Sequence, residues 1–264
     1  MLLRQSFSKS EINLTLELFL HMLHSILGVE LVSVYLYGSI VFDDLAQGYG
    51  DFDFLVAVGA DLSEENSGAL LEMRKTLRNG QLGVYAHMLE GEFLPIPMLK
   101  RKVKGAAVYW GTKSEQKIAE NQLGSFDLLL LKSKGLLIYG SDLHDKFEEV
   151  SQEELFVSIN QSIATIRKYA IHTESIHSVD WLFLISRIIL WLKENRLDSK
   201  SAAALWAYQY CRGEWKLYLP KAIEIRKNPS LGDEPSIKEW LKNLGDPIQG
   251  ACDELEEELK LFLK

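Results

Sequence analysis

Two aspartates and a Gly-Ser pair are the residues of this chain whose types and spacing suit catalysis. Gly38-Ser39 follows an apolar run, and Asp51-Phe52-Asp53 comes after eleven intervening residues. Because strand side chains alternate faces, Asp51 and Asp53 point to the same side of the expected strand. Two carboxylates on one face are costly unless a cation neutralises them, and Mg²⁺ prefers one or two carboxylates plus phosphate oxygens. The pattern predicts that Asp51 and Asp53 are catalytic residues that bind Mg²⁺.

Gly38 and Ser39 are predicted to bind phosphate. A glycine lets the backbone approach a phosphate closely, and the serine offers both a hydroxyl and an amide. Alone, Gly-Ser is a generic turn, and Asp-X-Asp is common at solvated strand ends. The two together, one after a strand and one opening a strand, form a much more specific signal.

Lys200 is a third candidate for binding phosphate. Asp198 or Ser199 is a natural N-cap for a helix that runs through residues 202–210. A lysine in the first turn of that helix faces the positive end of the helix dipole, at a cost of about 0.3–1 kcal/mol. A bound anion such as a triphosphate would remove this cost, whereas a solvated lysine would simply tolerate it.

Alternating helix and strand signals in the first half of the chain position these residues. Helical periodicity precedes a β-branched and aromatic strand, a second strand follows the Gly- and Asp-rich loop, and a charged helix leads to a turn and a third strand. The expected ranges are 10–28 for the first helix, 32–37 and 52–58 for the first two strands, 63–78 for the second helix and 82–89 for the third strand. This order predicts a small sheet domain covered by helices.

From residue 151 onward nearly every segment is helical. Trp181, Ile185, Ile188, Ile189 and Leu192 recur at helical spacing and are predicted to be core residues. The chain is therefore expected to divide into a sheet domain, residues 1–145, and an all-helical bundle, residues 146–264.

Composition excludes several classes of protein. A net charge of -8 disfavours a general nucleic-acid binder and suits a cationic small molecule better. The two cysteines, Cys211 and Cys252, exclude a disulfide framework and make a reducing cytoplasm the simpler assumption. No secretory signal pattern is expected at the N-terminus, and residues 14–27 read as an amphipathic helix too polar to span a bilayer. We therefore expect a cytoplasmic protein with no membrane and no nucleic-acid partner.

The Gly-Ser and Asp-X-Asp motif resembles the signature of the nucleotidyltransferase superfamily with a polymerase-beta-like palm. Arg187, followed by residues 198–206 (DSKSAAALW), is similar to the pattern of the helical domain in the streptomycin/spectinomycin adenylyltransferase family. The resemblance covers most of the chain between residues 30 and 230, although only these two blocks are specific. It implies an α+β fold, in which a mixed-sheet nucleotidyltransferase domain precedes a C-terminal helical bundle.

The resemblance also implies a reaction. In the family, Mg²⁺, as two ions, bridges the aspartates and the triphosphate of ATP, the co-substrate. A substrate hydroxyl attacks the α-phosphorus, pyrophosphate leaves, and AMP remains on the antibiotic. Lys200 matches a lysine that contacts ATP. The acids with which the family grips aminoglycoside amines have no clear match near residues 174–180.

One departure from the family concerns the catalytic base. The family carries a glutamate on its third strand, and the expected strand at residues 82–89 places Gly83 there. His87 is the nearest titratable group on the same face and is the predicted base, although it would lie on the order of 13 Å along the strand. Glu90 and Glu92 follow as further candidates. Alternatively, the acceptor needs no strong base, because the metal ions already acidify its hydroxyl.

The expected function is transfer of AMP from ATP to a hydroxyl of a small, cationic, aminoglycoside-type antibiotic, which would confer resistance. The alternative is a nucleotide- or drug-binding protein on the same fold that is catalytically silent because Gly83 replaces the glutamate. A transferase acting on protein side chains is a third reading, which the expected helical domain argues against.

Overall fold

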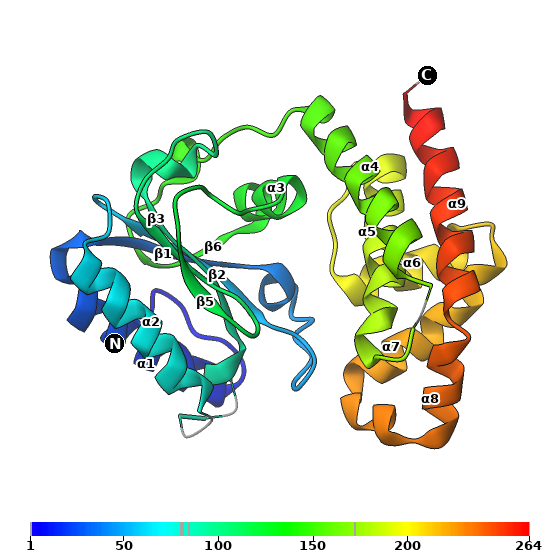
Figure 1. The fold of residues 1–264 in the computed structure, drawn as a ribbon, viewed down its shortest axis with the longest axis horizontal. Helices are drawn as coiled ribbons and strands as arrows, with labels where there is room; N and C mark the ends of the chain where they lie inside the picture. Colours follow the sequence, from blue (N-terminus) through cyan, green and yellow to red (C-terminus); the bar gives the residue numbers. More distant parts are fainter. Residues whose placement is uncertain (1, 80–81, 84, 172, 264) are drawn as a thin grey trace. The chain divides into compact units, whose positions relative to one another are not determined.

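A computed structural model describes residues 2–79, 82–83, 85–171 and 173–263. The chain divides into two compact units. The first contains residues 1–45 and 51–151, and the second contains residues 46–50 and 152–264 (Figure 1). The division after Ser151 lies a few residues beyond the expected boundary at 145/146. Residues 46–50, between the two halves of the predicted motif, group with the helical unit.

The first unit is built on a six-stranded sheet with the order β5-β4-β3-β2-β1-β6. The central pair β2 and β3 is parallel, and the other described pairings are antiparallel. The predicted mixed sheet is therefore confirmed. The strands are β1 (Leu31–Tyr37), β2 (Phe52–Val58), β3 (Leu89–Pro95), β4 (Ala107–Trp110), β5 (Glu115–Ile118) and β6 (Leu136–Gly140).

Helices cover the sheet on both faces (Figure 1). On one face, α1 (Ser10–Leu27) and α2 (Glu64–Arg78) bury a large core, and α3 (Ser125–Lys134) contacts β1 from the other. α2 connects the parallel strands, as such a pair requires, and its N-cap Ser63 accepts a hydrogen bond from Asn66 N at 3.0 Å. The centre of the core is an aromatic cluster of Phe19, Phe54, Phe93 and Trp110.

The first helix is more apolar than predicted from residues 14–27, which were expected to be too polar to span a bilayer. Residues 10–30 are long and apolar enough, by length and composition alone, to span a membrane. In the structure, however, one face of α1 packs on the sheet, and Leu16, Phe19, Leu20 and Leu23 are fully buried there. A core helix of this kind passes the same compositional test as a membrane span.

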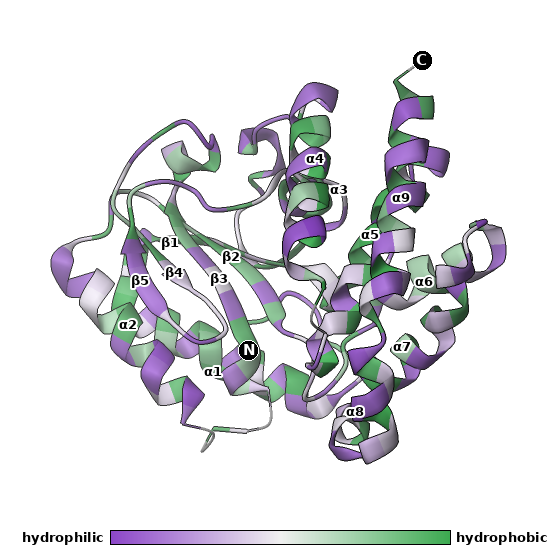
Figure 2. Ribbon diagram, turned by 45° about the vertical axis from the view of Figure 1, so that its right-hand side comes forward, coloured by the Kyte–Doolittle hydropathy of each residue, from purple (hydrophilic) through white to green (hydrophobic). Residues whose placement is uncertain are grey.

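The second unit is helical and is organised around α5, most of whose side chains are buried between α6 and α9. Apolar residues recur along α9 between charged ones, so that this helix is amphipathic (Figure 2). The unit contains α4 (Gln152–Tyr169), α5 (Asp180–Glu194), α6 (Lys200–Tyr210), α7 (Leu219–Lys227), α8 (Pro235–Lys242) and α9 (Gly245–Phe262). The predicted α+β fold with a C-terminal helical bundle is confirmed.

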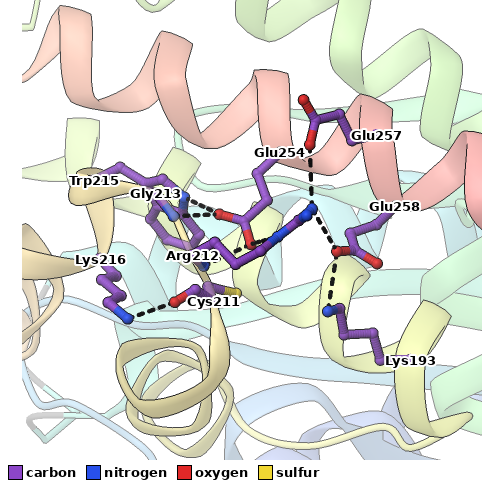
Figure 3. A network of polar contacts seen from close by, with 9 residues as sticks. All are labelled: Lys193, Cys211, Arg212, Gly213, Trp215, Lys216, Glu254, Glu257 and Glu258. Carbon is purple, nitrogen blue, oxygen red and sulfur yellow. Dashed lines mark hydrogen bonds and ion pairs between the residues drawn. The ribbon is translucent and has the colours of Figure 1, made fainter.

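A polar network fastens the turn after α6 to α9 (Figure 3). The buried Glu254 carboxylate accepts hydrogen bonds from Arg212 N at 2.9 Å, Gly213 N at 2.9 Å and Trp215 Nε1 at 2.8 Å. The Arg212 guanidinium reaches Glu257 and Glu258, each at 3.1 Å. Matched charges and donors therefore stabilise this part of the bundle.

Candidate functional site

Gly38 lies directly after β1 and opens a short 3₁₀ segment, η2 (Gly38–Phe42). Its φ is +71°, and a Cβ at this position would collide with the carboxylate of Asp53. Only glycine fits both the dihedral angle and this close approach. The next residue, Ser39, is half-buried and donates from Oγ to the backbone carbonyl of Asp51 at 3.4 Å. The two halves of the predicted motif are therefore adjacent in space.

Asp53 occupies the middle of a row of three residues at one end of the sheet. It pairs with Tyr37 of β1 on one side and with Glu90 of β3 on the other. Phe52 and Phe54 point into the aromatic core, so by alternation Asp53 faces the opposite side of the sheet. Asp53 and Glu90 are both half-exposed. Their register places two acidic residues side by side on adjacent strands.

The predicted third strand at residues 82–89 is wrong. The strand begins at Leu89, and the described residues before it form a turn and the 3₁₀ segment η3 (Ala86–Met88). Gly83 is exposed with a φ of +101°, and so it is not at the strand position of the family's glutamate. Val84 of the predicted strand lies outside the described residues. Glu90 occupies the strand position beside Asp53.

His87 is therefore not a strand residue that faces the site. It is exposed on η3, and its backbone carbonyl accepts a hydrogen bond from Arg74 Nη1 at 3.1 Å. His87 was predicted as the base only because residues 82–89 were expected to form a strand, whereas His87 lies on η3. A signal for the correct strand was present: Leu89-Glu90-Gly91-Glu92-Phe93 alternates non-polar residues and acids, just as Phe52-Asp53-Phe54 does.

Glu90 receives two hydroxyl hydrogen bonds. Tyr109 donates to Oε1 at 2.9 Å, and Thr112 donates to Oε2 at 2.8 Å. Burial, together with the charges of Glu90, Glu92 and Asp51, raises the pKa of Tyr109, so this phenol remains protonated and donates.

Glu92 lies two residues further along the same face of β3 but is only 2 % exposed. Both of its carboxylate oxygens accept from Gln122 N, at 3.0 and 3.2 Å. Burial raises the pKa of Glu92 to about 7, against the lowering effect of the Gln122 hydrogen bond and with a further rise from Asp127. Glu92 therefore anchors the segment before α3, and its burial makes it a poor candidate for contact with a substrate.

The acidic residues of this face concentrate negative charge. The buried phenol of Tyr37 lies near these charges: burial, followed by the charges of Asp53, Asp127, Glu92 and Glu90, raises its pKa. Among the described residues, no group of three or more His, Cys, Asp or Glu side chains is arranged to hold a metal ion. The oxygen donors of Asp51 and Asp53 nevertheless fit Mg²⁺, which completes its coordination with water and substrate phosphates.

Lys200, the remaining predicted residue, lies in the second unit at the start of α6. Of the two predicted N-caps, Asp198 and Ser199, the structure uses Ser199, which accepts from Ala202 N at 3.0 Å. Lys200 Nζ forms an ion pair with Asp180 Oδ1 at 2.7 Å. A carboxylate of the protein therefore offsets the unfavourable position of this lysine at the helix N-terminus.

Asp180 is the centre of a polar cluster that the sequence analysis missed. Tyr49 donates to its Oδ2 at 3.0 Å, and the His177 imidazole lies 3.6 Å from the same oxygen. Burial would raise the pKa of Asp180, but His177, Lys200 and Tyr49 together lower it to about 2. Tyr49 belongs to the 46–50 segment, which packs within the helical unit.

A cavity of about 460 Å³ opens beside this cluster, within the helical unit. Its lining includes Asp180 and Lys200, the half-buried Arg187 and the apolar surfaces of Trp181 and Leu184. Two cations, one carboxylate and an aromatic ring suit a ligand that carries both charged and flat apolar groups. Arg187 and Lys200, which carry the family resemblance in this half of the chain, thus line the same cavity.

Comparisons with known proteins agree with this architecture. Residues 145–246 match the family described as aminoglycoside adenylyltransferase, C-terminal domain. No curated protein sequence matches the chain. Among solved structures, spectinomycin adenyltransferase AAD(9) from Enterococcus faecialis, crystallised with ATP and spectinomycin, is similar over 93 % of this chain and 98 % of its own. The TM-score is 0.66 at 18 % identity, a likeness that shows the fold. The resemblance inferred from the motifs is confirmed: residues 145–246 match the aminoglycoside adenylyltransferase C-terminal domain model, and 93 % of the chain shares the fold of spectinomycin adenyltransferase.

Proposed function

We propose that the chain is an adenylyltransferase that transfers AMP from ATP to a hydroxyl group of an aminoglycoside-type antibiotic. One observation carries the proposal: Gly38, Asp53 and Glu90 come together at one end of the sheet through the registers of β1, β2 and β3. The solved structure of similar fold was crystallised with ATP and spectinomycin, which supports ATP as co-substrate and a drug of this class as acceptor.

Asp51 and Asp53 would hold Mg²⁺. When bound, Mg²⁺ would neutralise the triphosphate and stabilise the charge that develops on its oxygens. The backbone amides at Gly38 and Ser39 would bind phosphate oxygens of ATP. Lys200 is a separate proposed phosphate contact within the helical unit. Lys200 would exchange its ion pair with Asp180 for the phosphate.

Glu90 takes the role of general base, in place of His87. Its carboxylate accepts the proton of the acceptor hydroxyl, the hydroxyl oxygen bonds to the α-phosphorus, and the bond from that phosphorus to pyrophosphate breaks. Gly83 was the observation behind the catalytically silent alternative. Because Gly83 precedes the strand, that observation no longer argues against turnover.

The test is AMP transfer by the purified chain with ATP, Mg²⁺ and a panel containing streptomycin, spectinomycin and other aminoglycosides. An antibiotic–AMP adduct in the mass spectrum, with matching pyrophosphate release, is the expected result. Asp53→Asn should lower the rate at least a hundredfold, because several kcal/mol of metal-dependent stabilisation is lost. Asp145→Asn is the matched control, since Asp145 is an exposed aspartate whose carboxylate pairs with Lys146.

The absence of an adduct with every acceptor would contradict the proposal. If ATP and Mg²⁺ then still raise the melting temperature, and Asp53→Asn removes that rise, the chain is the silent nucleotide-binding protein instead.

A further inference from the structure

Both carboxylate oxygens of Glu90 accept hydrogen bonds from the β4–β5 hairpin. Tyr109 lies at the register position opposite Glu92, one step diagonal from Glu90, and its phenol reaches Oε1. Thr112 lies in the exposed turn after β4, and its hydroxyl reaches Oε2. Two donors on separate oxygens restrict rotation of the carboxylate more than one donor would.

The turn that carries Thr112 is itself fixed by hydrogen bonds to its backbone. Arg74, only 1 % exposed, donates from Nη2 to the Gly111 carbonyl at 3.1 Å, and its guanidinium lies 5.7 Å from the centre of the Trp110 ring. Gly111 N donates to the Ser114 carbonyl at 2.7 Å, which closes the turn. A buried cation from α2 therefore fixes the backbone that presents the Thr112 hydroxyl.

Hydroxyl donors suit a carboxylate that has to accept a proton. A lysine or arginine in place of Tyr109 or Thr112 would neutralise Glu90 and weaken it as a base. A hydroxyl orients the carboxylate without neutralising it. Each carboxylate oxygen also keeps a second lone pair, which can accept the hydroxyl of an acceptor. The raised pKa of Tyr109 keeps this phenol a donor at neutral pH.

We propose that Tyr109 and Thr112 are positioning residues that hold the Glu90 carboxylate in the orientation needed to take the proton of the acceptor hydroxyl. The proposal rests on the proposed function and adds to it, because it identifies what makes Glu90 an effective base. We call these two residues the hydroxyl pair.

The experiment compares kcat and KM of wild type, Thr112→Val, Thr112→Ser and Tyr109→Phe in AMP transfer. Thr112→Val and Tyr109→Phe each remove one hydroxyl at nearly constant shape and should lower kcat about tenfold, the usual loss for one hydrogen bond to a charged group. KM for ATP should stay within about twofold, since the pair contacts no predicted nucleotide ligand. Thr112→Ser keeps the donor and should restore most of the rate.

A double-mutant cycle separates positioning from a structural role. In a Glu90→Gln background the carboxylate to be positioned is gone. There, Thr112→Val and Tyr109→Phe should each lower kcat by a further factor of less than about two. A structural role would instead give the same cost in both backgrounds.

Three results would overturn the proposal. If the substitutions lower kcat equally in both backgrounds while the wild type transfers AMP, the positioning role of the hydroxyl pair is refuted and the proposed function stands. A Glu90→Gln variant as fast as wild type would refute both the role of Glu90 as the base and the positioning role of the hydroxyl pair. A wild-type chain that transfers no AMP would overturn the proposed function and the pair together.

Discussion

Two groups of acidic side chains in this molecule have opposite surroundings. In the helical unit, Glu254 accepts from two backbone amides and an indole, and Arg212 and Lys193 pair with the neighbouring Glu258 (Figure 3). At the sheet end, Glu90 lies in register beside another acid, Asp53, and accepts from two uncharged hydroxyls. Cations and backbone amides anchor the first group, whereas two hydroxyls anchor the carboxylate of Glu90 in the second.

The difference separates structural acids from candidate catalytic acids. Carboxylates that are paired with cations and amides stabilise the folded state when they ionise. Adjacent carboxylates repel one another, which costs stability and favours a bound cation. Substitutions in and around the two groups test this difference.

The largest effect is expected at the sheet end. Glu90→Gln should lower the rate of AMP transfer by about 10² to 10⁴, the usual contribution of a general base, without lowering the melting temperature. His87→Gln, an exposed position on η3, should retain at least half of the wild-type rate. Steady-state kinetics with a responsive antibiotic measures both, and a greater loss in His87→Gln than in Glu90→Gln would return the base to His87.

Glu92, the buried acid of β3, should make the free energy of unfolding depend on pH. Its pKa is about 7 in the folded state against 4.5 as the ordinary value. The folded state therefore binds the proton of Glu92 more tightly than the unfolded state does. The free energy of unfolding that this proton contributes is fully present below pH 4.5 and is lost as the pH rises through 7. The loss is on the order of 3 kcal/mol.

Glu92→Gln removes the titrating group. Urea unfolding between pH 5 and 8 should show a flatter dependence for Glu92→Gln than for wild type. The same slope in both proteins would mean that Glu92 does not titrate in this range.

In the helical unit the effect should fall on stability rather than on activity. Glu254→Gln leaves donors of Arg212, Gly213 and Trp215 incompletely satisfied and should lower the free energy of unfolding by about 2 kcal/mol. Glu257→Gln, which is 62 % exposed at the side chain and also contacts Arg212, is the matched control and should cost less than about 0.5 kcal/mol. Thermal unfolding measures both, and equal costs would contradict the structural role of Glu254.

The smallest effect is expected at Tyr49. Tyr49→Phe keeps the ring contact with His177 but removes the hydrogen bonds to Asp180 and to the Ile176 carbonyl, at a cost of about 1 kcal/mol. Asp180 has a lowered pKa, so the stability it contributes is present above pH 4 and is lost as the pH falls towards 2. Unfolding at pH 7, 4 and 2 should show the cost of the substitution shrinking over that window, and a constant cost would indicate packing alone.

Much of the local structure was predictable because it depends on short-range patterns. The apolar runs of β1 and β2 identify these strands by composition, and Ser199 caps α6 through its own side chain. The Gly-Ser and Asp-X-Asp spacing predicted that Gly38 and Asp53 belong together, and the structure places the glycine against that carboxylate.

The third strand was not predictable with the same certainty. Residues 82–89 contain enough apolar and aromatic side chains to suggest a strand, whereas Leu89–Pro95 contains two acids, a glycine and a terminal proline. Pairing with β2 and β4 and burial of Phe93 in the aromatic core override these weak local preferences.

The two-part organisation and the chemistry-bearing motifs were predictable because each depends on residue types at short, fixed spacings. The identity of the acid beside Asp53 and the ion pair between Asp180 and Lys200 follow from the fold alone. Strand register and the packing of residues 46–50 with α5 join residues far apart in the chain, and such contacts follow from burial and pairing rather than from local sequence.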